Sequence, residues 1–323
     1  MSEKKENLEN KNRDHSEREE HNHSHGSHCH SHVFNENKKN KFLWVIIINF
    51  SISIFEIAAG VLSSSVALIA DAFHNLEDTA SAVLSLIAWK ISFKKPDREK
   101  TYGYKRAEIV AAFLNSVFLM AVCVFLISES LKRFFSPREI NSDFMLIAAF
   151  AAFLANMVSV WLLKEDSKDN INWKSAYLHM LGDALFSLAV IAGALSVKIW
   201  NFYWADPILS FSMSVFIIIQ TFKVFKKSLS ILMQSSADLD YEKIKKEIEN
   251  LQGVKNIHHV HTWMTNENTV YFEAHVEVEE MTVSKTCEIS SKAEEILKKN
   301  YGIYHTTLQF ETDRCQKKEM FGN

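Results

Sequence analysis

The stretch Asp71–Asp78, with the sequence DAFHNLED, lies inside a mostly apolar run, Val66–Phe93, that is long enough to cross a lipid bilayer. A spanning helix needs about 20 mostly apolar residues, and open loops do not span lipid. His74 and Asp78 are four residues apart, so they project from one face of such a helix. Because an ionised carboxylate within the bilayer is unfavourable by at least ~2.5 kcal/mol, this polar pair indicates a function.

A second apolar run, Ala176–Trp200, repeats the pattern in the stretch HMLGD, where His179 and Asp183 are again four residues apart. Two imidazole nitrogens and two carboxylate oxygens from facing helices form a four-coordinate set, which suits the tetrahedral preference of zinc. The alternative is a buried structural network, or polar groups that contact water near a helix end. The presence of two such pairs in two separate spans favours the metal site.

Six stretches have the length and apolar character of membrane spans. They are Phe42–Leu62, Val66–Phe93, Arg106–Leu131, Asp143–Leu163, Ala176–Trp200 and Ala205–Lys226. Lys and Arg are concentrated before the first span, in the 2–3 and 4–5 loops, and at the end of the sixth span, although the 3–4 loop also carries three of them. Since positive loops stay in the cytoplasm, both termini are predicted to be cytoplasmic. The polar N-terminus has no apolar core of a signal peptide, so none is expected.

Composition divides the chain into four parts. Residues 1–41 form a predicted disordered, His-rich cytoplasmic tail, 42–232 a six-helix transmembrane domain, 233–314 a soluble α+β domain, and 315–323 a short tail. In the soluble part, alternating and amphipathic patterns predict an αββαβ order. The predicted elements are helix Leu239–Leu251, strands Val254–Thr262 and Val270–Val278, helix Thr282–Asn300 and strand Ile303–Glu311. The fold class is therefore an α-helical membrane protein with a small α+β domain.

Charge and motif content disfavour other classes of protein. The formal net charge of −3 argues against a nucleic-acid binder, which usually has a basic face. The four cysteines form no CxxC pair, as expected for soluble parts in a reducing compartment rather than for a disulfide framework. The chain contains no HExxH motif, so we do not expect a metalloenzyme.

Together with the two His-x3-Asp pairs, several further motifs make the chain resemble the zinc-transporting branch of the cation diffusion facilitator family. They are the segment Thr101–Glu108 (TYGYKRAE), the start of the sixth span at Asp206–Ile208 (DPI), Gly253-Val254, His258 and His261-Thr262-Trp263. The resemblance runs from about residue 42 to 313. It implies a homodimer of six-helix protomers that works by alternating access and exchanges metal for protons. It also implies that His74, Asp78, His179 and Asp183 form the transport site, with zinc as the main metal and cadmium or cobalt as further ones.

The C-terminal domain contains a second group of candidate ligands. Neighbouring strands can bring His258, His275 and His305 together, and Glu311 follows on the last strand. The resemblance implies a regulatory zinc site at these positions, while ordinary roles in the folded domain are the alternative. Cys315 stands without the paired cysteines that some members of the family carry, which counts against a thiolate-rich site.

The tail carries interspersed histidines that can bind zinc loosely on a flexible chain. The candidates are His21, His23, His25, His28, His30 and His32. Local delivery of zinc to the transport site is one hypothesis for them. A dispensable low-complexity tail is the other.

The sequence thus predicts a Zn²⁺/H⁺ antiporter that exports zinc from the cytoplasm. Metal binding requires neutral imidazole and ionised carboxylate, so zinc and protons compete for the same groups. The expected partners are divalent metal ions, protons, the lipid bilayer and a second copy of the chain. A composition rich in Lys, Asn and Ile suggests a bacterial inner membrane. The alternatives are a metal sensor or scaffold that moves no zinc, a passive channel, and a transporter of another main divalent metal.

Overall fold

The computed structural model describes residues 36–168, 171–315 and 318–321. The predicted histidine tail, His21 to His32, lies outside these residues. The first described helix begins at Glu36, six residues before the predicted first span. The sequence ENKKNK, which contains good helix formers, continues the helix beyond its apolar part.

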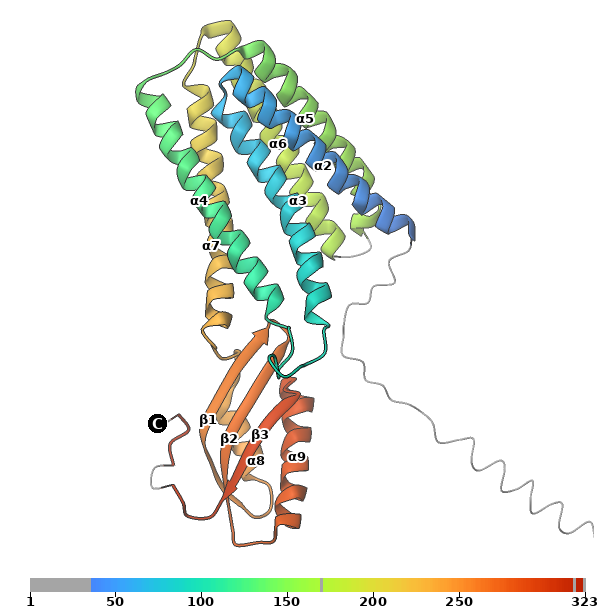
Figure 1. Ribbon diagram of the computed structural model, residues 1–323, viewed down its shortest axis with the longest axis vertical. Coiled ribbons are helices and arrows are strands. Elements are labelled where there is room, and N and C mark those ends of the chain that lie inside the picture. Colours follow the sequence, from blue (N-terminus) through green and yellow to red (C-terminus); the bar gives the residue numbers. More distant parts are fainter. Residues whose placement is uncertain (1–35, 169–170, 316–317, 322–323) are drawn as a thin grey trace, which may run out of the picture. The chain divides into compact units, whose positions relative to one another are not determined.

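Six long helices make up the N-terminal part of the described chain (Figure 1). They are α2 (Glu36–Ser63), α3 (Val66–Ser92), α4 (Ala107–Phe135), α5 (Ser142–Leu163), α6 (Ile171–Trp200) and α7 (Ala205–Leu232), with a short 3₁₀ helix, η1 (Asp166–Lys168), before α6. Among the described residues, five of the six are long and apolar enough to cross a membrane. The sixth, α3, has 27 residues, and its polar side chains reduce its apolar character.

The packing of these helices is that of a protein in lipid. Large apolar side chains point outward, as shown by Trp161, which is 73% exposed, and Phe125, which is 64% exposed. Polar side chains are buried between the helices, among them Asn49, Glu56 and Asn156. Buried polar groups need partners when no water is available, so these interior side chains mark where the helices interact.

The N-terminus of α3 is held by an acidic side chain from α7. Ser65 caps α3 by accepting a hydrogen bond from the Leu68 amide, and Asp206 accepts bonds from the Ser65 hydroxyl at 2.5 Å, the Val66 amide at 2.9 Å and the Ala67 amide at 3.1 Å. The first amides of a helix have no partner within the helix, and the helix dipole favours a negative charge there. Asp206 therefore fixes the start of the helix that carries His74 and Asp78.

The C-terminal domain is a three-stranded sheet with two helices, as predicted. Its elements are α8 (Tyr241–Glu249), β1 (Val254–Asn266), β2 (Thr269–Val278), α9 (Val283–Tyr301) and β3 (His305–Glu311). The central strand β2 pairs antiparallel with β1 and parallel with β3. Both helices contribute to one apolar core with the sheet, for example through Ile248, Phe272 and Leu297. This arrangement confirms the predicted αββαβ order and the fold class.

Candidate metal centre

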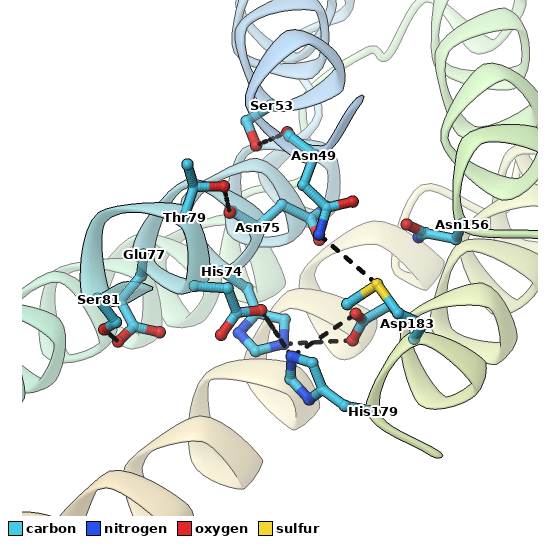
Figure 2. A network of polar contacts seen from close by, with 12 residues as sticks. Asn49, Ser53, His74, Asn75, Glu77, Thr79, Ser81, Asn156, His179 and Asp183 are labelled. Carbon is cyan, nitrogen blue, oxygen red and sulfur yellow. Dashed lines mark hydrogen bonds and ion pairs between the residues drawn. The ribbon is translucent and has the colours of Figure 1, made fainter. Parts of the chain in front are cut away.

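Helices α3 and α6 bring the two His-x3-Asp pairs together (Figure 2). One ligand atom from each of His74, Asp78, His179 and Asp183 lies within 4.8 Å of all the others. The two imidazole rings meet edge to face, with their centroids 5.6 Å apart. Asp183 is buried and His179 is 44% exposed, so the group has one side in the protein interior and one side that is accessible.

The spacing of these atoms matches a tetrahedral zinc site. The four His–Asp distances are 2.8 Å (His179 to Asp78), 3.4 Å (His74 to Asp183), 3.7 Å (His74 to Asp78) and 3.8 Å (His179 to Asp183). Bond lengths of roughly 2.0–2.1 Å place the ligands of a tetrahedral Zn²⁺ roughly 3.3 Å apart. The observed values scatter around that spacing, so a metal ion fits with small side-chain movements.

The accessible side of the quartet faces a cavity of about 910 Å³ between α3, α4, α6 and α7. Several of its lining side chains are polar, including Glu77, Ser81, Ser85, Asn115, Gln220 and Thr221. The polar lining residues of α3 and α7 lie closer to the C-terminal ends of these helices than the quartet does, and Asn115 lies near the N-terminus of α4. The cavity therefore extends toward the end of the bundle where the lysine- and arginine-rich 2–3 loop is located.

Beyond the quartet, toward the opposite end, the helices are closely packed. Ala67, Leu68 and Ala70 of α3 are completely buried, and so are Met145 of α5 and Ala194 of α6. Ala67, Leu68, Met145 and Ala194 belong to one apolar cluster. A hydrated ion at the quartet thus has an open route toward one end of the bundle and a closed one toward the other.

The sequence leaves Glu77 unassigned, and the structure places it on the cavity wall. Its Oε1 accepts hydrogen bonds from the Asn115 amide at 2.7 Å and the Ser81 hydroxyl at 2.6 Å. Figure 2 shows Glu77 and Ser81 side by side on α3, on successive turns of the helix. The signal in the sequence is the three-residue spacing from His74, which places Glu77 near the same helix face.

A second group of potential ligands lies in the C-terminal domain. It consists of His258, His275, Glu311 and Cys315, with one ligand atom of each within 4.8 Å of the others. Glu311 lies 3.0 Å from His258 Nε2 and 3.4 Å from His275 Nδ1. The Cys315 thiol lies 3.7 Å from His275 Nδ1. His258 Nδ1 lies 3.1 Å from the Asn256 side-chain oxygen, a contact that orients the imidazole with Nε2 directed at Glu311, where both could bind one metal ion.

The charges in this group favour metal binding. Burial lowers the pKa of His275, which keeps its ring neutral. Burial alone raises the pKa of Glu311, but the Cys315 thiol and the neighbouring His275 and His258 outweigh it and hold that pKa below its usual value. The hydrogen bond to Glu311 in turn raises the pKa of the Cys315 thiol. The lowered pKa of His275 thus favours a neutral ring and that of Glu311 an ionised carboxylate, whereas the thiol still has to lose a proton.

The structure does not bring His305 into this group, and Cys315 occupies its place. In the parallel pairing of β2 with β3, His305 is opposite Tyr271, whereas His275 is opposite Gln309. Four residues of strand correspond to roughly 13 Å, too far for a shared metal ion. Cys315 follows β3 and returns to His275, a contact for which the sequence offers no periodic signal.

Comparison with protein families agrees with this architecture. Residues 43–233 match the model of the cation efflux transmembrane domain, and residues 237–313 match that of the cation efflux protein cytoplasmic domain. This chain belongs to the cation efflux family. It is therefore an integral membrane protein, as the cation diffusion facilitator resemblance implied, and its C-terminal domain is of the type associated with dimer formation.

Curated members of the cation efflux family align along most of the chain. The zinc transporter ZitB of Pectobacterium atrosepticum is 35% identical over 278 residues, covering 85% of this chain and 86% of the relative. The cadmium, cobalt and zinc/H(+)-K(+) antiporter of Bacillus subtilis is 33% identical over 264 residues, covering 80% and 85%. The metal cation efflux system protein CzcD of Cupriavidus metallidurans is 31% identical over 263 residues, covering 81% and 83%.

Proposed function

We propose that this protein is a Zn²⁺/H⁺ antiporter that exports zinc from the cytoplasm by alternating access. The observation that carries the proposal is the quartet of His74, Asp78, His179 and Asp183, whose ligand atoms converge within 4.8 Å between two helices of the bundle. Membership of the cation efflux family and relatives named for zinc transport support it. The proposed location is a bacterial inner membrane, and the chain is a transporter rather than an enzyme.

The donor set supports zinc as the main substrate. Two nitrogens and two oxygens at tetrahedral spacing suit Zn²⁺, whereas Mg²⁺ and Mn²⁺ favour sites dominated by oxygen ligands. A relative whose name includes cadmium, cobalt and zinc supports Cd²⁺ and Co²⁺ as further substrates. The order of preference among these metals has to be determined by measuring their fluxes. Binding affinity alone does not decide it, because the affinity of most sites for divalent metals follows a general order set by the metal itself.

Proton exchange follows from the chemistry of the same side chains. His74 and His179 bind metal only when their rings are neutral, and imidazole titrates near neutral pH in water. A site that opens to the cytoplasm takes up Zn²⁺ and releases protons. When it opens to a more acidic compartment, protonation displaces the metal.

The cavity supports an inward-facing state. It extends from the quartet toward the end of the bundle where the positively charged 2–3 loop lies, and such loops stay in the cytoplasm. With six spans, this orientation places both termini in the cytoplasm. The closed packing around Leu68 and Ala194 forms the barrier that has to open for release on the other side.

The proposal is tested with the full-length protein in proteoliposomes that contain a zinc indicator, with and without an imposed pH gradient. The variants His74→Ala, Asp78→Ala, His179→Ala and Asp183→Ala each lose a metal ligand. We expect each to lower pH-driven zinc flux by at least about 10–100-fold. His305→Ala, which lies outside the quartet, is the matched control and should transport normally.

The rival functions give different results in the same assay. A sensor or scaffold binds zinc to the quartet but shows no flux in the unmodified protein. A passive channel shows flux that does not depend on the imposed pH gradient. Normal transport by any two quartet variants contradicts the assigned transport site.

We also propose that His258, His275, Glu311 and Cys315 hold a regulatory zinc ion in a homodimer formed through the C-terminal domain. The convergence of their ligand atoms within 4.8 Å supports this site. The match to the family's cytoplasmic domain supports dimer formation. A site that needs loss of a thiol proton differs chemically from the transport quartet, and this difference allows the two to be distinguished experimentally.

A further inference from the structure

Two acidic side chains lie behind the metal quartet, on the side away from the cavity. Glu56 of α2 is 0% exposed and Asp71 of α3 is 1% exposed. Neither lines the 910 Å³ cavity. Close contact between the two helices places them together, because a side chain at Gly60 would come within 2.7 Å of Ile69.

The two carboxyl groups contact each other and a small set of neutral polar groups. They are close neighbours, because Asn75, which binds Glu56, lies one helical turn after Asp71 on the same face of α3. Glu56 Oε2 also accepts a bond from the Asn75 amide at 3.2 Å, and Asp71 Oδ2 accepts one from the Ser187 hydroxyl at 3.4 Å. Figure 2 shows Asn75 on α3 beside His74, with its side chain directed away from the metal ligands.

Within the described part of the chain, no Lys or Arg forms an ion pair with either group. The charged or titratable side chains that face the pair belong to the quartet, namely His74 on α3 and Asp183 on α6. Neither of these two hydrogen-bonds Glu56 or Asp71. The pair is therefore separate from the metal ligands but close enough for their charge to act on it.

This geometry requires a proton. Within the described residues, Glu56 Oε1 and Asp71 Oδ1 are buried and have no hydrogen-bond partner. Carboxylate oxygens only accept hydrogen bonds, so two neighbouring carboxyl groups can satisfy these oxygens only when at least one group carries a proton. Two adjacent buried charges without a cation would also be very unfavourable. A proton held by the pair would lie between α2 and α3, one helical turn before His74.

We propose that Glu56 and Asp71 form a second proton-binding site of the antiport, distinct from the quartet that binds the metal. The inference rests on the proposed function. When Zn²⁺ enters the quartet, its two positive charges oppose the nearby shared proton, because charges interact strongly in a medium of low dielectric constant. The proton leaves to water, and the pair changes from one negative charge to two. Release of zinc on the other side lets the pair bind a proton again.

Ser187 gives this site a structural link to the metal ligands. Its hydroxyl lies 3.4 Å from Asp71 Oδ2 and 3.0 Å from the backbone carbonyl of Asp183. Asn156 of α5 donates to the same hydroxyl at 3.3 Å. The pair on α2 and α3 is thus connected to α5 and α6, so the site involves four helices, including both that carry the quartet.

The test compares proton release on zinc binding between the full-length protein and Glu56→Gln. The glutamine side chain keeps the shape of Glu56 and can still donate a hydrogen bond to Asp71, but it has no acidic proton to release. In weakly buffered detergent solution with a pH indicator, we expect Glu56→Gln to release fewer protons per bound zinc, by about one. Its zinc affinity should change by less than about tenfold, since the quartet is intact. Glu129→Gln on α4, whose partner is Arg133, is the matched control and should release protons normally.

Infrared difference spectra provide a second measurement. Zinc binding to the unmodified protein should remove a carbonyl band of a protonated carboxylic acid, and Glu56→Gln should lack this change. If Glu56→Gln does not fold, Asp71→Asn takes its place, and the spectrum of the unmodified protein still decides. Equal proton release by variant and unmodified protein, or no loss of the band, overturns the proposal. A flux without dependence on the pH gradient instead overturns the antiport itself.

Discussion

At the scale of single residues, the two clusters of potential ligands differ in chemistry. The quartet contains only imidazole and carboxylate, whereas the C-terminal group includes the thiol of Cys315. Thiolate is a softer ligand and binds zinc more tightly than carboxylate, but only after it loses its proton. An exchangeable transport site and a more persistent regulatory site fit these two donor sets.

The thiol predicts a distinct pH dependence for the C-terminal site. The hydrogen bond to Glu311 raises the pKa of Cys315, so zinc binding has to displace a proton even where an ordinary thiol, with a pKa of about 8.5, is already ionised. The affinity of the C-terminal site for zinc should therefore rise with pH, by about tenfold per pH unit while one proton is displaced. The rise should continue above the pKa of an ordinary thiol. Competition with a zinc chelator measures this in an Asp183→Ala background, where the transport site is disabled.

Cys315→Ser is the matched variant. It should bind zinc at least about tenfold more weakly and lose the part of the pH dependence that the thiol contributes. Cys287→Ser, an exposed cysteine of α9, is the control. An unchanged affinity in Cys315→Ser indicates that the thiol is not a ligand.

At the scale of helices and strands, the junction of α3 and α7 explains how the quartet is held. The carboxylate of Asp206 is completely buried and accepts three hydrogen bonds at the start of α3. Because α3 carries His74 and Asp78, a shift of this helix end would move half of the transport site. The two helices are thus expected to move as one unit when the bundle opens to the other side.

Replacing this carboxylate should destabilise the protein. In Asp206→Asn, one oxygen still accepts, but the charge at the helix N-terminus is lost and an amide donor meets backbone amides. Loss of hydrogen bonds to a buried charged group costs about 1–3 kcal/mol, which should lower the thermal unfolding temperature in detergent. Asp143→Asn is the control, since its surface pair with Lys198 contributes at most about 1 kcal/mol. Equal unfolding temperatures for the two variants would show that Asp206 holds no such junction.

The elements themselves were largely predictable, while the contacts between them were not. Length and apolar character indicate the spans, and alternation indicates the strands of the C-terminal domain. The partner of His275 depends on the register of β2 with β3 and on the path of the chain after Glu311, neither of which has a periodic signal. Similarly, Glu56 and Asp71 are visible as costly charges in the sequence, but their pairing depends on how closely α2 approaches α3.

At the scale of the whole molecule, the cavity relates the proposed transport site to the two sides of the membrane. The quartet faces a space bounded by four helices, and the residues beyond it are closely packed. A transporter with one open and one closed route exposes cavity residues to one compartment at a time. Access to a single cavity position therefore reports both the orientation of the chain and its conformational state.

Ser85 of α3 lines the cavity beyond the quartet, toward the proposed cytoplasmic end, and gives such a position. In a chain whose own cysteines are replaced, Ser85→Cys should react with a membrane-impermeant thiol reagent quickly in inverted vesicles and slowly in right-side-out vesicles. Leu86 is the next residue along α3, and its side chain is 65% exposed on the outer, lipid-facing surface of the bundle. Leu86→Cys should therefore react slowly in both kinds of vesicle. Zinc should slow the labelling of Ser85→Cys, because metal bound at the quartet shifts the population toward states in which this cavity closes. Faster labelling in right-side-out vesicles would reverse the assigned orientation, and equal labelling from both sides would indicate a channel rather than alternating access.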